Sequence, residues 1–222
     1  MTVPFFSILF RPSEFFSRLV TEKENMTWPL VILLAGGIAA AGYGYLIGGV
    51  TAQMMGDAIP GIGAIITISS VFGAIIGVFI FWLIWSAVTY ALSMIFKGEG
   101  TFRRTLEVIA YGYLPQVFGS IIILIAGFEY IPKIVVPKIT SAMMQDPAAI
   151  QAATKMFVHD PAMMELTQIA SLVTIVFLLW SANIWIFGLQ HARKLSARDA
   201  ALCVGIPVIA YILYLIYMLG AA

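Results

Sequence analysis

The stretch from Ala64 to Phe96 is 33 residues long and contains no charged side chain. A helix of about 20 mostly apolar residues crosses the hydrocarbon core of a bilayer. Similar segments occur at Pro29–Val50, Leu106–Gly127, Ile169–Gln190 and Ala200–Leu219. A lone strand in lipid would leave its backbone polar groups unpaired, so each segment is predicted to be a helix. The sequence therefore predicts an all-α polytopic membrane protein with five transmembrane helices.

Composition supports this class. The chain is 61% hydrophobic and only 10% charged, whereas about a quarter of the residues in a soluble domain are charged. The net charge of +1 gives no overall field that would attract nucleic acid. The single cysteine, Cys203, rules out an internal disulfide and a multi-cysteine metal cage.

Basic residues predict the orientation, because loops rich in lysine and arginine stay in the cytoplasm. Three groups of three flank alternate spans, namely Arg11, Arg18 and Lys23, then Lys97, Arg103 and Arg104, then Arg193, Lys194 and Arg198. The opposite side has only Lys133, Lys138 and Lys155, all in its longest loop. We therefore expect a cytoplasmic N-terminus and an external C-terminus.

Two parts of the chain are expected to differ in character. Residues 1–28 are predicted to form a cytoplasmic amphipathic segment, and residues 29–222 a five-helix transmembrane domain with an external loop at about 128–168. In the first part, Glu14 and Arg18 are expected to pair opposite an apolar side made by Phe15, Phe16, Leu19 and Val20. Such a short helix either lies in the headgroup layer or simply leads into the first span.

The external loop carries two helix-start signals. Asp146 and Asp160 each precede a proline, which is a capping residue followed by a residue favoured in the first helical turn. We expect one helix to begin at each aspartate, the second continuing into the fourth span.

No catalytic or cofactor motif is present. The two histidines, His159 and His191, are predicted to lie on opposite sides of the membrane, and neither a zinc H-E-x-x-H motif nor a glycine-rich phosphate loop occurs. Methionines that share the external loop with His159 have ligand atoms that suit Cu(I). Most of them are adjacent pairs, however, which favours covering an apolar surface. We predict no enzyme activity, no cofactor and no metal.

Polar groups within the spans are few. The predicted span interiors contain no mid-membrane Asp, Glu, Lys, Arg or His, which argues against ion-coupled transport. The candidate intramembrane polar residues are Asn183 and Gln116. Asn183 lies near Ser181, where an amide either joins helices by hydrogen bonds or binds a neutral solute.

Small residues predict close helix packing. The first span contains "AGGIAAAGYGYLIGG", and the second repeats the small-residue spacing at Gly73 and Gly77. The first span is thus expected either at the centre of the bundle or at a homodimer contact.

One stretch, "GEGTFRRTLEVIAYGYLP", interrupts the apolar pattern and resembles the signature of the Yip-domain family, membrane proteins named for interacting with Ypt/Rab GTPases. The early "RPSEFFSRL" and the late "WIFGLQHARKLSARDAALCVGIP" resemble the ends of that family. The resemblance implies five spans, a cytoplasmic N-terminus and a non-enzymatic role, which in eukaryotes lies in Golgi and ER membrane traffic. This chain lacks their long N-terminal region and looks like short prokaryotic relatives in a cell membrane, so Rab binding is not carried over. The candidate cytoplasmic motif comprises Gly98, Gly100, Phe102, Arg103, Arg104, Glu107, Gly112, Tyr113 and Pro115.

Each residue of this motif also has a structural interpretation. Gly98 and Gly100 permit a tight turn with positive φ, and Thr101 is a candidate cap for the third span. Phe102 is expected to anchor at the interface, Arg103 and Arg104 to meet lipid phosphates, and Glu107 to pair with Arg103 one turn away. Gly112 and Pro115 allow close packing and a kink. A partner-binding role for the same residues is the alternative.

Two functions follow. The first is a non-catalytic membrane protein that organises the membrane or recruits partners. The alternative is a channel or transporter for a small solute or lipid. The expected partners are the lipid bilayer and either a second copy of the chain or another membrane protein.

Overall fold

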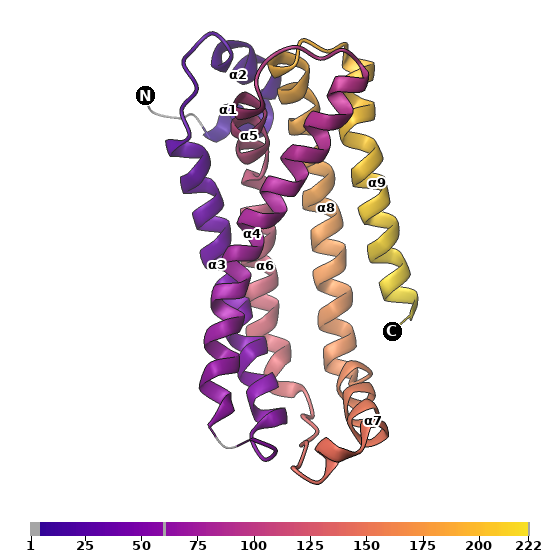
Figure 1. The fold of residues 1–222 in the computed structure, drawn as a ribbon. Coiled ribbons are helices and arrows are strands. Elements are labelled where there is room, and N and C mark those ends of the chain that lie inside the picture. The colour runs from indigo at the N-terminus through magenta and orange to yellow at the C-terminus, as the bar shows by residue number, and fades with distance from the viewer. Residues whose placement is uncertain (1–4, 60, 222) are drawn as a thin grey trace.

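The computed structural model describes residues 5–59 and 61–221, and within them the regular structure is entirely helical (Figure 1). Residues 1–4 of the predicted N-terminal segment lie outside the described residues. The α-helices are α1 (Phe5–Phe10), α2 (Pro12–Leu19), α3 (Thr27–Met55), α4 (Ile62–Ile95), α5 (Phe102–Gly112), α6 (Leu114–Tyr130), α7 (Pro147–Val158), α8 (Pro161–Ala192) and α9 (Ala197–Ala221). Two 3₁₀ turns, η1 (Ile131–Lys133) and η2 (Met143–Gln145), connect α6 to α7.

Five helices are long and apolar enough to span a membrane, which confirms the predicted number. They are α3, α4, α6 with η1, α8 and α9. The predicted third span, Leu106–Gly127, was placed wrongly, because the apolar helix covers Leu114–Lys133 instead. Residues before Leu114 belong to α5, a separate helix.

The break between α5 and α6 follows from the local sequence. Pro115 has no backbone N–H and occupies the first turn of α6, a position that proline favours. The N–H of Tyr113 bonds the carbonyl of Ala110, three residues back, at 3.1 Å, so the helical pattern tightens and ends there. The kink expected at Gly112 and Pro115 is thus a complete interruption.

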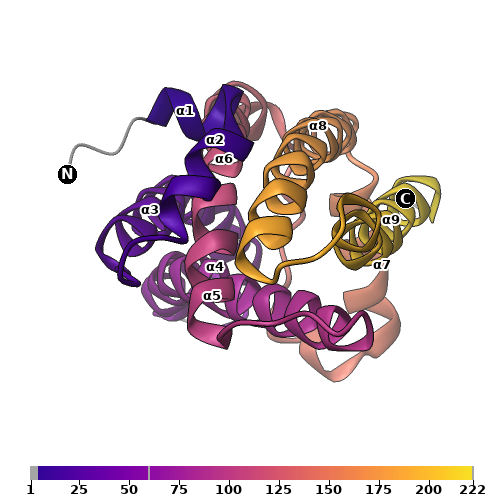
Figure 2. The same cartoon turned by 90° about the horizontal axis from the view of Figure 1, so that it is seen from above.

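Glycines bring α3 close to its neighbours. A Cβ on Gly44 would lie 2.8 Å from the carbonyl oxygen of Ser70 in α4, and one on Gly42 would lie 2.9 Å from Leu124 in α6. Gly42 and Gly44 therefore serve contacts of α3 with α4 and α6, which lie beside it in this chain (Figure 2). Gly73 and Gly77 of α4 differ, because a Cβ on either has no neighbour within 4 Å.

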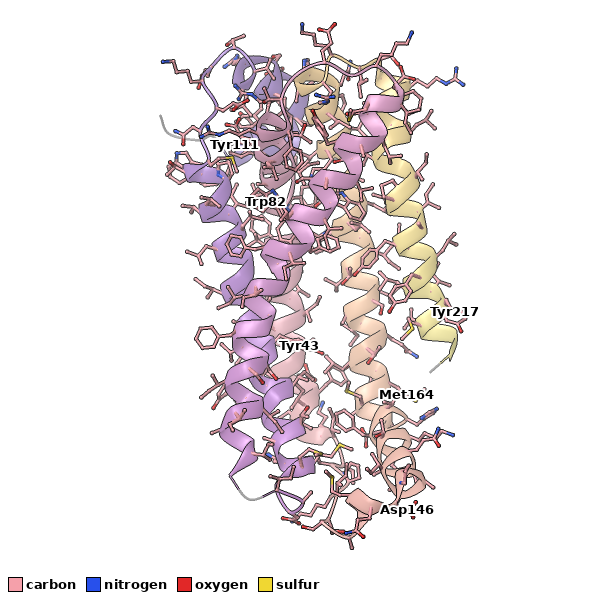
Figure 3. The ribbon with its side chains drawn as sticks, viewed as in Figure 1. Tyr43, Trp82, Tyr111, Asp146, Met164 and Tyr217 are labelled. Carbon is pink, nitrogen blue, oxygen red and sulfur yellow. The ribbon has the colours of Figure 1, made fainter. Side chains whose placement is uncertain are left out.

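The two ends of the bundle carry different additional elements. Helices α1, α2 and α5 lie at one end, and α7 lies at the other (Figures 1 and 3). Asp146 caps α7 by accepting from the N–H of Ala148 at 2.9 Å, and Asp160 caps α8 by accepting from Ala162 at 3.0 Å. Both predicted helix starts are confirmed. Which end faces the cytoplasm stays a prediction.

Helix α2 packs on the bundle through its apolar side. Phe16 is completely buried in the main core, and a Cβ on Gly188 of α8 would lie 3.2 Å from its ring. Phe15 contacts Tyr111 of α5 edge to face, with 5.1 Å between ring centroids. Glu14 pairs with Arg11, at 3.8 Å, and not with Arg18 as expected. The apolar side of α2 thus faces protein.

Candidate functional site

The turn between α4 and α5 is held by one buried arginine from the turn between α8 and α9. Arg193 is 2% exposed, and its guanidinium donates to the Ser93 hydroxyl at 2.9 Å, to the Gly98 carbonyl at 2.7 Å and to the Gly100 carbonyl. The same guanidinium lies over the Tyr90 ring, 4.3 Å from its centroid. We call this arrangement the Arg193 latch. Its planar fork of donors suits several fixed acceptors at once.

The two glycines of this turn serve different purposes. Gly100 has a φ of 101°, which confirms the predicted positive φ. Gly98 does not; the second positive φ in the turn belongs to Lys97, at 57°. Gly98 is instead needed for space, since a Cβ there would lie 2.9 Å from the Ser93 carbonyl oxygen.

A second buried charge cluster joins α5 to the segment that follows α2. Arg104 donates to Glu107 at 2.6 Å, to the Leu19 carbonyl at 3.2 Å and to the Glu22 carbonyl. Glu107, completely buried, also accepts from the backbone N–H of Asn25 at 3.2 Å. Two predictions are therefore wrong: Arg104 does not meet lipid phosphates, and Glu107 pairs with Arg104 and not with Arg103.

Burial raises the pKa of Glu107 above its ordinary value, and the Asn25 N–H and the Arg104 charge oppose that effect. Burial also raises the pKa of the nearby Tyr111 to about 12, with a smaller contribution from Glu107. Since the charged groups here bind one another and backbone carbonyls, the cluster is suited to fastening the N-terminal segment.

The first turn of α5 is capped as predicted. Thr101 accepts from the N–H of Arg104 at 3.1 Å, although the helix it caps is α5 and not the third span. Phe102 packs edge to face on Tyr90, with 5.2 Å between centroids. Arg103 is exposed and lies 3.6 Å from Glu24.

The end of α5 packs directly on a tryptophan. A Cβ on Gly112 would overlap the ring of Trp185 in α8, so only glycine fits. The indole N–H of Trp185 donates to the Ile109 carbonyl at 2.8 Å. An uninterrupted helix would offer that carbonyl the N–H of Tyr113, which is used elsewhere, so the tryptophan satisfies a group that the helix break leaves free. The indole N–H of Trp82 in α4, labelled in Figure 3, donates to the Leu106 carbonyl of α5 at 2.9 Å.

Beyond the break, Tyr113 and Gln116 line a cavity of about 190 Å³ between α4, α6, α8 and α9. Phe81, Leu178 and Tyr211 also line it. Each is about 14 residues, or roughly 21 Å, from the end of its helix on the α5 side, which is near the middle of the bundle. The Gln116 amide nitrogen is buried and has no protein hydrogen-bond partner within the described residues.

Asn183 lies elsewhere. It is exposed and lines a groove of about 430 Å³ between α8 and the corner joining α1 to α2. Asn183 faces the N-terminal helices at the outer surface of α8, and whether its amide joins helices or binds a neutral solute stays a prediction.

The described residues contain no group of three or more His, Cys, Asp or Glu side chains that could hold a metal ion. The histidines occupy opposite ends of α8, where His159 follows α7 and His191 contacts Ser13 at 3.2 Å.

Sequence reasoning missed two central residues. Arg193 was used only to predict the orientation, and Trp185 was given no role. The position of Arg193 at the end of an apolar span was a usable signal, because carbonyls of a facing glycine turn are natural acceptors for it.

The Yip1 domain family matches residues 6–219 of this chain. An uncharacterized protein of Methanocaldococcus jannaschii is 31% identical over 114 residues, which cover 51% of this chain and 81% of that protein. No solved structure matches. With a family match over nearly its whole length and five helices able to span a membrane, the chain belongs to the Yip1 domain family of multi-pass membrane proteins.

Proposed function

We propose that this chain is a non-catalytic protein of a prokaryotic cell membrane that organises the surrounding bilayer, with the end that carries α1, α2 and α5 in the cytoplasm. The distribution of basic residues supports the orientation. The archaeal relative supports the source membrane.

The position of α1 carries the proposal. The Leu9 carbonyl accepts from the Trp180 indole of α8 at 3.3 Å. Trp180 lies 12 residues before the end of α8, which is about 18 Å along the helix axis. A helix of 32 residues is about 48 Å long and extends about 9 Å beyond each side of a 30 Å hydrocarbon core. This depth supports a location for α1 among the outer lipid tails of one leaflet.

The exposed side chains of α1 fit that location. Phe5, Phe6 and Phe10 are 42%, 67% and 58% exposed. Phenylalanine is typical of the apolar face that an interfacial helix buries at the boundary between headgroups and tails. A helix that occupies area in one leaflet only, held to five spans, favours a curved bilayer.

We also propose that the chain recruits partners. Lys97, Arg103, Lys194 and Arg198 are exposed at the same end and can bind acidic surfaces or lipids. Self-association is supported by the α4 face that carries Gly73 and Gly77, because small residues without neighbours allow a second helix to approach closely.

The experiment is reconstitution into liposomes, with vesicle diameters measured by electron microscopy. We expect the wild type to give smaller or tubular vesicles, and a Phe6→Ser/Phe10→Ser variant to leave them unchanged. Phe128→Ser is the matched control, because Phe128 is 63% exposed on α6, towards the opposite end. Vesicles of unaltered shape with correctly folded wild type would refute the proposal.

The cavity beside Gln116 favours one second candidate, passage of a small neutral solute. Nearer the α5 end of the same helices, α4 and α8, Trp85 and Trp185 are buried with ring centroids 5.4 Å apart. That packing supports the organiser. Glycerol permeability of proteoliposomes distinguishes the two: a rate above that of empty liposomes that Gln116→Leu abolishes would establish transport.

A further inference from the structure

The groove beside Asn183 has walls that are fastened to each other. Its floor on α8 includes Asn183 and Phe187, and its rim on the N-terminal helices includes Phe10, Arg11, Ser13 and Glu14. The rim is attached to α8 by the Trp180–Leu9 hydrogen bond on the side nearer the middle of the bundle and by the contact of Ser13 with His191 at the end of α8. The groove of about 430 Å³ is therefore held open by contacts on both sides.

The depth of the groove coincides with the region where a phospholipid changes from apolar to polar. Asn183 lies nine residues before the end of α8, or about 14 Å, which is about 5 Å inside the hydrocarbon boundary estimated above. An exposed amide at that depth is costly unless a polar group reaches it. The oxygens that link glycerol to the lipid chains lie near this level.

The rim carries one charge of each sign. Arg11 and Glu14 have side chains 66% and 62% exposed, with 3.8 Å between guanidinium and carboxylate. Arg11 lies between the levels of Leu9 and Ser13, and its long side chain can extend towards the headgroups. A phosphate suits the guanidinium, and an ammonium group with N–H donors suits the carboxylate. Phe10 and Phe187 line the same groove and suit a lipid chain.

We propose that this groove binds one phospholipid with a zwitterionic phosphoethanolamine headgroup, its phosphate on Arg11, its ammonium on Glu14 and its glycerol oxygens on Asn183. The proposal rests on the insertion of α1 into one leaflet that the proposed function assumes. An anionic glycerol headgroup would bring no cation to Glu14, and a choline headgroup has no N–H to donate.

The experiment uses the full chain in nanodiscs made from equal parts of phosphatidylethanolamine, phosphatidylcholine and phosphatidylglycerol. Lipids that remain bound after transfer to detergent are identified by native mass spectrometry. We expect phosphatidylethanolamine to be retained preferentially, and Arg11→Gln to reduce its retention about tenfold, as loss of a charge-assisted hydrogen bond implies. Glu14→Gln should move the preference towards phosphatidylglycerol, and Asn183→Leu should weaken retention of all three lipids.

Arg103→Gln is the matched control, because Arg103 is also exposed beside a glutamate but lies on α5; it should retain lipid like the wild type. Equal retention of the three lipids by the wild type, or unchanged retention by folded Arg11→Gln, would overturn the proposal. Phe6→Ser separates the two proposals. If this variant no longer remodels vesicles but still retains the bound lipid, lipid binding in the groove does not depend on membrane curvature. Absence of remodelling in the wild type with selective retention would refute only the proposed function.

Discussion

Gly112 and Trp185 show how one position can serve both geometry and hydrogen bonding. The missing side chain lets the indole ring lie against the end of α5, and the indole N–H then reaches the Ile109 carbonyl. Any larger residue would displace the ring and leave that carbonyl without its donor. The cost would thus combine overpacking with an unsatisfied buried group.

We expect Gly112→Leu to lower the unfolding free energy by more than about 3 kcal/mol. Arg103→Ala should change it by less than about 1 kcal/mol, because the Arg103 side chain is 65% exposed and its 3.6 Å ion pair with Glu24 is open to water on that side. Thermal unfolding in detergent measures both. Gly205→Leu in α9 is the control for adding a leucine, since a Cβ at Gly205 meets no neighbour within 4 Å; equal losses at Gly112 and Gly205 would contradict the packing role.

The buried carboxyl of Glu107 gives stability a specific pH dependence. Because burial raises its pKa in the folded protein, the stability that its protonated form contributes is fully present below the ordinary pKa of 4.5 and is lost as the pH rises through the raised value. We therefore expect the melting temperature of Glu107→Gln, relative to the wild type, to increase from acidic to neutral pH.

Glu99→Gln is a control of opposite sign. A hydrogen bond from Lys194 lowers the pKa of Glu99. The stability that the Glu99 carboxylate contributes is therefore present above the ordinary pKa of a glutamate and is lost as the pH falls through the lowered pKa. A melting-temperature difference for Glu107→Gln that follows the same direction as Glu99→Gln would mean that the Arg104 charge outweighs burial.

At the scale of elements, α5 and the turn before it are held from three directions. Trp82 and Trp185 donate to its carbonyls, Arg104 fastens it to the N-terminal segment, and the Arg193 latch fixes the turn. This short helix is therefore anchored at its start, along its length and at its end.

We expect Arg193→Lys to lower the melting temperature and to make the turn at Lys97–Gly100 sensitive to trypsin. A lysine ammonium cannot donate to Ser93, Gly98 and Gly100 together, as the planar guanidinium of Arg193 does. Lys194→Gln is the adjacent control, because its pair with Glu99 is exposed and contributes little. Equal protease resistance of the wild type and Arg193→Lys would show that the latch is dispensable.

Elements that local signals determine were predictable from the sequence. The aspartate–proline pairs place the starts of α7 and α8, Thr101 caps α5, and unbroken apolar runs locate four of the five spans. The third span was misplaced because α5 is amphipathic and its polar side is buried, a situation that only tertiary contacts create. The same reason hid the burial of Arg104 and Arg193, which donate to backbone carbonyls distant in the sequence, and of Glu107, which accepts from the distant N–H of Asn25.

For the whole molecule, the predicted orientation can be tested with single cysteines. Ser196 and Ser141 are exposed at opposite ends of the bundle, in the turn before α9 and in the loop before α7. In a Cys203→Ala background, a membrane-impermeant thiol reagent applied to intact cells should label Ser141→Cys and not Ser196→Cys. Labelling of Ser196→Cys alone would invert the topology, and labelling of both would contradict the five-span arrangement.

The Arg193 latch also has a consequence for biogenesis. Ser93 precedes Arg193 by 100 residues, so the acceptors of the latch leave the ribosome two spans before their donor. Until α8 is inserted, the glycine turn has no partner, and after insertion a long arginine side chain must give up water for carbonyl oxygens. Closure of the latch therefore marks the point at which the fourth span has been inserted, and a chain halted before that residue would present an open turn to the quality-control proteases of the cell.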